Sequence, residues 1–258
     1  MLAAETILLP NGYKWPVFVG GAGPLLVWLH GVRRVDAGDP LLEALARRFR
    51  IVAPLAPGFA EAADLDAFDT IHDIAFGYDD LLLALREPVA LLAGHSTGAM
   101  FAAEAAAHAP DRADRLALIA PIGLWSEAHP VADLFIAPGA EIDRLLWRDE
   151  AAADRFNARQ QPASDADALI GSARDLRAAA KFLWPIPDRG LRKRLRRIRA
   201  PTMIVFGLKD KVVPPHYADE FAREMPKAKI VRMEEAGHMA PYEQIEETAA
   251  LLLRFAGR

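Results

Sequence analysis

Short apolar runs alternate along the chain with longer stretches in which apolar residues recur every three or four positions. Continuous apolar runs are typical of strands that are buried on both faces of a sheet. They occur at Leu25–Leu29, Ile51–Ala53, Val89–Ala93, Leu116–Ile119, Thr202–Phe206 and Lys229–Met233. Two earlier runs, Glu5–Leu9 and Trp15–Val19, flank Asn11-Gly12, a turn dipeptide that indicates a hairpin at the start of the chain.

Amphipathic or alanine-rich stretches between these runs predict helices. We expect them at Pro40–Arg48, Ile71–Arg86, Ser96–Ala109, Tyr217–Met225 and Pro241–Ala256. Thr70 stands where a capping residue would begin the second of them, and Pro241 occupies the first position of the last. Strands that alternate with helices predict a mostly parallel, eight-stranded sheet that helices cover on both faces, the α/β class.

The stretch from Gly123 to Arg189 interrupts this alternation. It shows no convincing strand, is rich in Asp, Arg and Ala, and carries scattered bulky aromatic residues. Such a segment is too long for a plain connection and too apolar for disorder. We therefore expect a core domain formed by residues 1–122 and 190–258, with residues 123–189 as a helical insertion that lies over the sheet as a cap.

Composition and charge exclude several classes of protein. The 258 residues are 52% hydrophobic and 26% charged, with a net charge of −4, which gives no reason to expect nucleic acid as a partner. The absence of cysteine excludes disulfides, a thiol nucleophile and thiolate metal sites. No apolar run approaches the length of a membrane helix, and the first residues do not resemble a secretion signal, so we expect a cytoplasmic protein without membrane contact.

Arg189–Arg199 holds seven basic residues in eleven, the densest charge in the chain. One interpretation is a patch that binds anions or nucleic acid. We favour an amphipathic helix with Leu191, Leu195 and Ile198 turned inward and the cations in solvent, because the chain as a whole is acidic.

The motif Gly94-His95-Ser96-Thr97-Gly98 is the strongest chemical signal in the sequence. It follows one predicted strand directly and opens a predicted helix. A turn sharp enough to expose a serine there requires small neighbours and a strained serine backbone. The helix N-terminus also places N–H groups beside the serine, where an oxyanion would form. We therefore predict that Ser96 is a nucleophile.

A serine nucleophile requires a base and a group that orients the base. Of seven histidines, His238 is the favoured base because it lies between the last strand and the last helix. Asp210 follows the strand Thr202–Phe206 and is the favoured carboxylate. In a parallel sheet all three residues would lie at the carboxyl edge. His30 and His95 flank the site, and we expect them to hold loops rather than transfer protons.

Five sequence markers, in this order, resemble the α/β-hydrolase superfamily over nearly the whole chain, and in particular its capped esterases and C–C hydrolases. They are Leu29-His30-Gly31, the segment 53–59 (APLAPGF), GHSTG, the segment from Ala200 to Pro214 that includes Asp210, and Gly237-His238 followed by Glu243. The order Ser, Asp, His along the chain is also the order of that superfamily.

The resemblance implies a role for each matching residue. Ser96 would be the nucleophile, His238 the general base and acid, and Asp210 the residue that orients the imidazole. The backbone N–H groups of Val32 and Thr97 would form the oxyanion hole. Substrate specificity would reside in the cap, where Trp125, Trp147 and Trp184 are candidates to line the pocket or to form a small core of the cap itself.

The resemblance leaves several activities open. Ser96 argues against haloalkane dehalogenases and epoxide hydrolases, which use a carboxylate nucleophile. The leading activity is hydrolysis of carboxylic esters of small to medium, largely apolar substrates. The second is C–C bond hydrolysis of the meta-cleavage-product type, on a vinylogous diketone acid, which the segment 120–124 (APIGL) favours, and the third is a perhydrolase activity. A binding protein without activity is the remotest alternative. We expect a small-molecule ester or ketone as partner and neither a cofactor nor a metal, and the sequence leaves the oligomeric state open.

Overall fold

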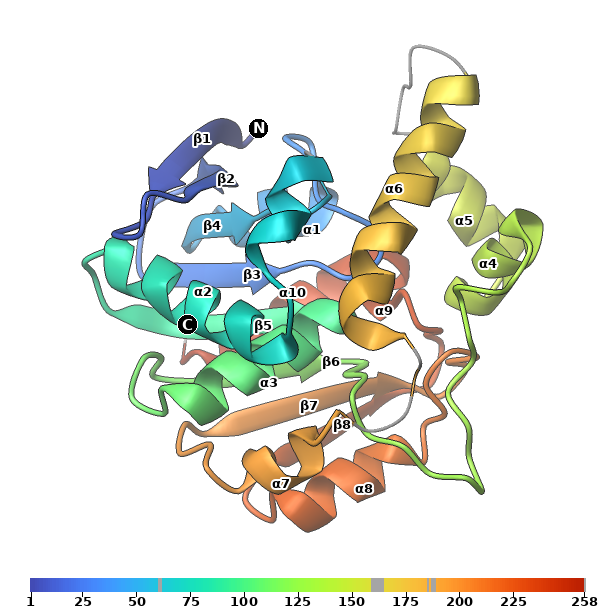
Figure 1. Ribbon diagram of the computed structural model, residues 1–258. Helices are drawn as coiled ribbons and strands as arrows, with labels where there is room; N and C mark the ends of the chain where they lie inside the picture. The colour runs from blue at the N-terminus through green and yellow to red at the C-terminus, as the bar shows by residue number, and fades with distance from the viewer. Residues whose placement is uncertain (60–61, 159–164, 185, 187–188, 258) are drawn as a thin grey trace.

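The sheet has eight strands, and the structure, a computed structural model, describes residues 1–59, 62–158, 165–184, 186 and 189–257. The strands are β1 (Ala3–Leu8), β2 (Lys14–Gly20), β3 (Leu25–Leu29), β4 (Arg50–Pro54), β5 (Val89–His95), β6 (Leu116–Ile119), β7 (Thr202–Gly207) and β8 (Lys229–Met233). Their order across the sheet is β1-β2-β4-β3-β5-β6-β7-β8 (Figure 1). Strands β3 to β8 are parallel, while β1 and β2 form an antiparallel hairpin whose second strand pairs with β4. The predicted fold is confirmed.

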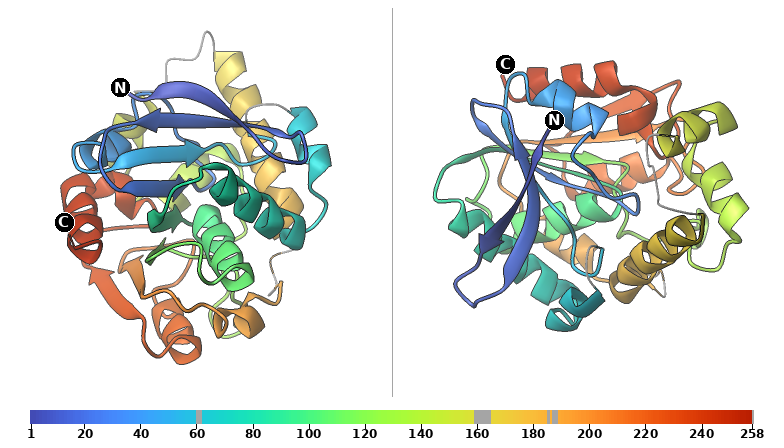
Figure 2. Two further views of the ribbon diagram at one scale, coloured as in Figure 1. Left: turned by 90° about the vertical axis from the view of Figure 1, so that its left-hand side faces the viewer. Right: turned by 90° about the horizontal axis from the view of Figure 1, so that it is seen from above.

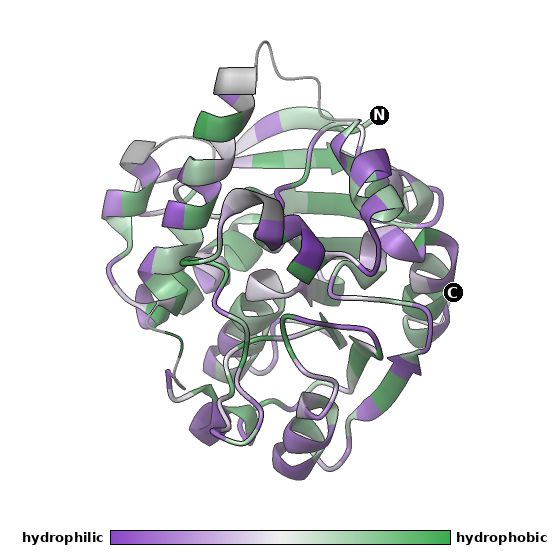
Figure 3. Cartoon of the chain, turned by 90° about the vertical axis from the view of Figure 1, so that its right-hand side faces the viewer, coloured by the Kyte–Doolittle hydropathy of each residue, from purple (hydrophilic) through white to green (hydrophobic). Residues whose placement is uncertain are grey.

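Alternating side chains of the strands enter two separate apolar cores. In β3, Leu25, Val27 and Leu29 pack on one face of the sheet, and Leu26 and Trp28 pack on the other. This is the two-residue period of a strand that is buried on both faces. Figure 3 shows the strands largely in green, the colour of hydrophobic residues, while the surrounding helices carry both green and purple positions.

Helices cover both faces of the sheet. One face is covered by α1 (Pro40–Leu45) and α10 (Ile245–Phe255), and the other by α2 (Ile71–Ala84), α3 (Thr97–His108), α7 (Leu191–Leu195) and α8 (Tyr217–Glu224). Seen from above in Figure 2, the sheet lies between α10 (red) and α2 (teal). A 3-10 turn, η1 (Ala62–Ala67), precedes α2.

The predicted helix starts agree with the structure except at the end of the chain. Thr70 caps α2 through a reciprocal pair of hydrogen bonds with Asp73. The single helix expected over Pro241–Ala256 is wrong: the chain forms a short helix α9 (Ala240–Glu243) and then α10. The break falls at Gln244, whose φ of −131° and ψ of 59° are not helical, and the Gln244 side-chain amide donates to the Glu235 carbonyl outside the helix.

Within its described residues, the stretch 123–189 contains three helices. These are α4 (Gly139–Leu146), α5 (Glu150–Asn157) and α6 (Asp165–Leu183). Figure 1 places them together beyond the ends of the β-strand arrows, at the carboxyl edge of the sheet. Residues 159–164, 185 and 187–188 of the expected insertion lie outside the described residues. The division into core and cap at residues 122/123 and 189/190 stays a prediction.

The basic segment Arg189–Arg199 forms α7 and the turn after it. Leu191 and Leu195 are buried, as predicted, but Arg192 and Arg194 are ion-paired with carboxylates of α8 and α3 rather than solvated. Arg194 makes two hydrogen bonds of 2.6 Å to the buried Glu104 of α3, and Arg192 contacts Glu220. The positive charge of this segment therefore helps to fix α7 against the core.

Two adjacent arginines connect the loop after β3 to the helices of the insertion. Arg33 donates to Asp143 of α4 at 2.5 Å, and Arg34 approaches Asp175 of α6 at 3.3 Å. Asp175 is only 8% exposed, and its burial raises the pKa of the carboxyl to about 6 despite the positive charge of Arg34. The buried ionised carboxylate of Asp175 therefore weakens the fold at neutral pH.

Asp175→Asn tests this cost. The pKa of Asp175 is higher in the folded state than in the unfolded state, so the folded protein holds this proton more tightly. The resulting contribution to the free energy of unfolding is complete below about pH 4 and is lost as the pH rises through about 6. The free energy of unfolding of Asp175→Asn, minus that of wild type, should therefore increase by about 1–2 kcal/mol when the pH is raised from about 5 to about 8. Urea unfolding at both pH values measures this gain. Asp167→Asn, an exposed change on the same helix, is the control and should show no such dependence.

Candidate active site

Ser96 lies at the turn between β5 and α3, with a backbone strained as the motif predicts. Its φ is 55° and its ψ is −117°, in a region that L-residues rarely adopt. Gly98 is required beside it because a Cβ there would meet the carbonyl oxygens of Leu29 and His30 at 2.1 and 2.4 Å. A Cβ on Gly94 would likewise meet Gly98 O at 2.4 Å. These two glycines let α3 start directly against the strands.

The structure brings Ser96, His238 and Asp210 together in one continuous hydrogen-bonded chain. His238 Nε2 is 2.8 Å from Ser96 Oγ, and His238 Nδ1 is 2.9 Å from Asp210 Oδ2. Ser96 is 3% exposed, His238 is fully buried and Asp210 is 7% exposed. The three residues follow β5, β7 and β8, and therefore meet at the carboxyl edge of the sheet, as expected from the parallel topology.

The Asp210 carboxylate is held in place by its own loop. Its Oδ1 accepts hydrogen bonds from the backbone N–H groups of Val212 and Val213 at 2.8 and 2.9 Å, which leaves Oδ2 for the imidazole. An ionised acceptor at Nδ1 requires that this nitrogen carry the proton. Nε2 is then the free base that faces Ser96 Oγ.

His30 and His95 are buried next to the site and hold loops through hydrogen bonds. His30 accepts from Ala56 N at Nε2 and lies 2.7 Å from Gly31 O at Nδ1, so it connects the loops after β3 and β4. His95 Nε2 donates to the carbonyl oxygen of His238 at 2.7 Å. Burial lowers the pKa of His30 to about 4 and that of His95 to about 3, so both imidazoles are neutral at pH 7.

Val32 and Thr97, whose amides are the predicted oxyanion hole, belong to segments next to Ser96. Thr97 is the first residue of α3, where backbone N–H groups have no acceptor within the helix. Gly31, directly before Val32, packs so tightly against Ser96 that an added Cβ would lie 3.0 Å from the Ser96 Cβ. Both amides therefore belong to segments that border Ser96. Their service as an oxyanion hole stays a prediction.

The three tryptophans occupy different environments. Trp147 is 2% exposed and packs against Phe156 with ring centroids 5.1 Å apart, within the buried cluster that also contains Val32 and Met239. Trp184 is 51% exposed. Trp125 is partly buried and donates to Glu127. Their contact with a substrate stays a prediction.

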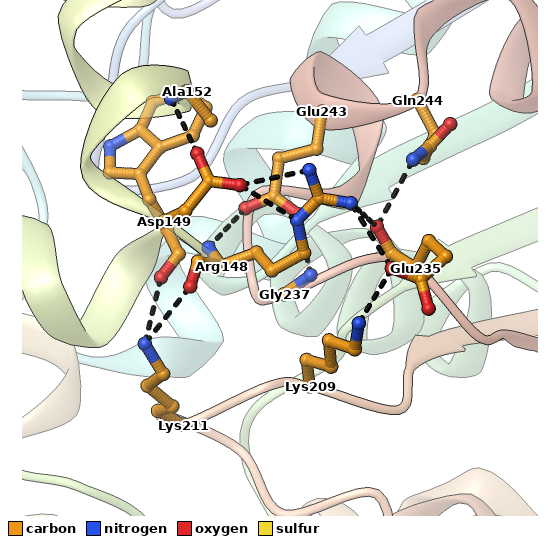
Figure 4. Close-up of polar contacts among 10 residues, drawn as sticks. Arg148, Asp149, Ala152, Lys209, Lys211, Glu235, Gly237, Glu243 and Gln244 are labelled. Carbon is orange, nitrogen blue, oxygen red and sulfur yellow. Dashed lines mark hydrogen bonds and ion pairs between the residues drawn. The ribbon is translucent and has the colours of Figure 1, made fainter.

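Sequence reasoning gave no role to several residues that fix the loops of this site. Glu243 entered only as part of a marker, although its carboxylate binds the amide of Gly237 beside His238. Lys211, next to Asp210, donates to carbonyl oxygens at the end of α4 (Figure 4). A charged residue directly beside a catalytic candidate is the signal that could have drawn attention to Lys211.

The described residues contain no group of three or more His, Asp or Glu side chains arranged to hold a metal ion. In the same part of the chain, no helix combines the length and the apolar character needed to span a membrane.

The fold agrees with the protein family to which the chain is similar. The family model described as "Alpha/beta hydrolase family" matches residues 19–251. This chain belongs to the alpha/beta hydrolase family. The match covers the sheet from β3 to β8, all three residues of the hydrogen-bonded chain and the whole insertion.

Curated relatives in this family differ widely in length. Polyketide synthase ThaQ of Burkholderia thailandensis is 27% identical over 250 residues, which are 92% of this chain but 12% of the synthase. The chain therefore spans a small part of that relative. A pimeloyl-[acyl-carrier protein] methyl ester esterase of Nitrosomonas europaea is 26% identical over 247 residues, covering 86% of this chain and 91% of the esterase.

Solved structures of this family superpose over almost the whole chain. A serine hydrolase involved in carbazole degradation, the CarC enzyme, has a TM-score of 0.79 at 21% identity and covers 100% of this chain and 99% of its own. Naproxen esterase of Bacillus subtilis has a TM-score of 0.74 at 17% identity, with coverages of 99% and 91%. At these identities the likeness shows the fold.

His95→Gln tests the role of a neutral histidine behind the site. The pKa of His95 is lower in the folded state than in the unfolded state. As the pH falls below about 6.5, the unfolded chain takes up a proton at this position and the folded protein does not, so the folded state loses stability. Between about pH 7 and about pH 4.5, wild type should lose about 2–3 kcal/mol more than His95→Gln, which retains a donor for His238 O.

Chemical denaturation at the two pH values provides the measurement. The exposed His72, changed to Gln, is the matched control and should lose stability in parallel with wild type. Parallel loss in His95→Gln as well would contradict the assignment of a neutral, buried His95.

Proposed function

We propose that this chain is a serine hydrolase that cleaves carboxylic esters through an acyl-enzyme. The observation that carries the proposal is the hydrogen-bonded chain Ser96 Oγ–His238 Nε2–His238 Nδ1–Asp210 Oδ2, with bonds of 2.8 and 2.9 Å among buried groups. A nucleophile in contact with a base, and a base held by a carboxylate, form the arrangement that acyl transfer requires.

Each residue would act in two half-reactions. Ser96 Oγ attacks the carbonyl carbon of the ester while His238 Nε2 takes the hydroxyl proton. The tetrahedral oxyanion accepts hydrogen bonds from the amides of Val32 and Thr97, and His238 then returns the proton to the departing alcohol oxygen. Water, deprotonated by the same imidazole, attacks the acyl-enzyme, and His238 returns that proton to Ser96 Oγ as the acid is released. Asp210 stabilises the imidazolium that forms in each half-reaction.

A largely apolar substrate is supported by the side chains near the site. Residues 123–189 would act as a cap, because their described helices lie at the carboxyl edge of the sheet (Figure 1). Leu146, Trp147 and Phe156 of this stretch belong to one buried cluster together with Val32 and Met239, which border the site. A substrate that binds beside these buried apolar side chains would be desolvated there at a lower cost with an apolar acyl or alcohol group than with a charged one.

Relatives named as esterases support the same activity. The relative of similar length from Nitrosomonas europaea is named as a methyl ester esterase, and naproxen esterase shares the fold. Cleavage of a C–C bond beside a ketone is the second candidate. It is favoured by the likeness to the carbazole-degradation hydrolase and to a meta-cleavage product hydrolase, which has a TM-score of 0.78 at 18% identity.

Initial rates on p-nitrophenyl esters, from acetate to decanoate, test ester hydrolysis. Wild type should show saturable turnover with an optimum at short or medium chain length. Ser96→Ala should lower kcat by about 10⁴-fold or more, because the nucleophile and its base act as a unit. Thr6→Ala, a change on the outer strand β1, is the control and should leave the rate unchanged. Equal rates for wild type and Ser96→Ala would contradict the proposal.

A coloured ring-fission product of meta-cleavage distinguishes the second candidate. An esterase should bleach this compound slowly in comparison with its best p-nitrophenyl ester. If kcat/KM for bleaching exceeds that for the best ester by about 10-fold or more, a difference of about 1.4 kcal/mol in transition-state binding, C–C hydrolysis becomes the better assignment. Ser96→Ala serves as the blank in both assays.

A further inference from the structure

Glu243, at the end of α9, links two segments that are far apart in the sequence. Its Oε2 accepts a hydrogen bond from Gly237 N at 2.6 Å, and its Oε1 accepts one from Arg148 N, also at 2.6 Å (Figure 4). Gly237 directly precedes His238, whereas Arg148 lies between α4 and α5. One carboxylate therefore connects the histidine loop to the insertion.

The residue after His238 is connected to the same place. Met239 N donates to Leu146 O at 3.1 Å, and Leu146 is the last residue of α4. His238 thus lies between two backbone amides, one of which reaches residues 146–149 directly and the other through Glu243. We refer to residues 146–149 as the α4–α5 joint.

The loop that carries Asp210 meets the joint as well. Lys211 Nζ lies 3.1 to 3.2 Å from the carbonyl oxygens of Arg144, Trp147 and Arg148. A cation at a helix C-terminus is favourably placed because the last carbonyl groups of a helix lack partners and carry partial negative charge. Both loops that flank the imidazole are therefore bonded to the end of α4.

Close packing leaves little freedom between Glu243 and the histidine loop. A Cβ added to Gly237 would lie 2.8 Å from Arg148 N and 3.0 Å from Glu243 Oε1. Burial raises the pKa of Glu243, while the two N–H donors and the charge of Arg148 oppose that rise. Two N–H groups that converge on two carboxylate oxygens match the ionised form of this side chain.

Glu235 provides the contrast, since it belongs to the same loop and contacts the same arginine. Its side chain is 63% exposed and forms ion pairs with Lys209 and the Arg148 guanidinium. Exposed pairs of this kind contribute little because solvent screens them and the side chains lose entropy. The Glu243 carboxylate binds backbone amides, whereas the Glu235 carboxylate binds charged side chains at the surface. A comparison of variants at the two positions therefore distinguishes an effect on the position of the loop from an effect of surface charge.

We propose that Glu243 is a positioning residue, which holds the backbone of residues 237–239 against the α4–α5 joint so that the His238 imidazole stays between Ser96 Oγ and Asp210 Oδ2. This inference rests on the proposed role of His238 as the base. Displacement of a base by about 1 Å can lower a rate about 10²-fold. The contact of the insertion with the core is then a condition for proton transfer.

Glu243→Gln is the decisive variant, with Glu235→Gln as the matched control. Gln retains the shape of Glu but offers one oxygen for two N–H donors and turns an NH₂ group toward one of them. We expect kcat for the best p-nitrophenyl ester to fall by about 10-fold or more with KM within about 2-fold of wild type. Glu235→Gln should match wild type in both constants.

Two further readouts do not depend on the choice of substrate. A fluorophosphonate labels an activated serine, and its rate constant with Ser96 should fall in Glu243→Gln in proportion to kcat. The downfield proton resonance of His238 Nδ1–H, bonded to Asp210, should be sharp in wild type and shifted or broadened in the variant. If Glu243→Gln does not fold, Glu243→Asp, which retains the charge but is too short to reach both amides, takes its place.

The outcomes separate this inference from the proposed function. Wild-type kcat, labelling rate and proton resonance in a folded Glu243 variant would overturn the positioning role while leaving the hydrolase intact. A wild-type protein in which Ser96 is not labelled would overturn the hydrolase proposal, and the positioning role with it. Loss of thermal stability with unchanged kcat and labelling would show that Glu243 only holds the fold together, which also overturns the inference.

Discussion

The close approach of α3 to the central strands is the constraint on which the site depends. The first turn of α3 lies so near β3 that Gly98 has room for no side chain, and Ser96 accepts an unfavourable backbone conformation as a result. That strain persists because the β5–α3 turn is held from several directions, including a bond from Ser96 N to Ile119 O at 2.8 Å. The serine hydroxyl and the amide of Thr97 are both presented at the sheet edge because of this one turn.

Burial decides the chemical state of the groups around the turn. His30 and His95 are neutral because burial lowers their pKa values more than their hydrogen bonds to backbone carbonyl groups raise them, and each fixes a loop that borders Ser96. Asp210 is also buried, but two backbone amides and an imidazole satisfy its carboxylate. Three histidines within one small region therefore differ in their hydrogen-bond partners, and residue type alone would not distinguish them.

The sequence was informative where structure depends on neighbours along the chain. Apolar runs located the strands, small residues around Ser96 located the sharp turn, and the parallel topology placed Asp210 and His238 near it. The contacts of the insertion could not be predicted in this way. Glu243 and Lys211 bind backbone atoms of residues that lie many positions away along the chain, and the helix is interrupted at Gln244. No local sequence pattern indicates which distant backbone atoms the fold brings next to these side chains. Trp147 and Trp184 looked alike in the sequence, yet one is buried and the other half exposed, since only tertiary packing distinguishes them.

The bonds at the α4–α5 joint also have a consequence for how such proteins diversify. On the side of the insertion, the atoms bound by Glu243, Lys211 and Met239 are all main-chain atoms: Arg148 N, Leu146 O and the carbonyl oxygens of Arg144, Trp147 and Arg148. Main-chain atoms are the same whatever side chains the insertion carries. Side chains of α4 and α5 can therefore be substituted while the main-chain atoms that attach these helices to the histidine loop stay the same. The attachment tolerates a change of sequence that a set of side-chain ion pairs would not.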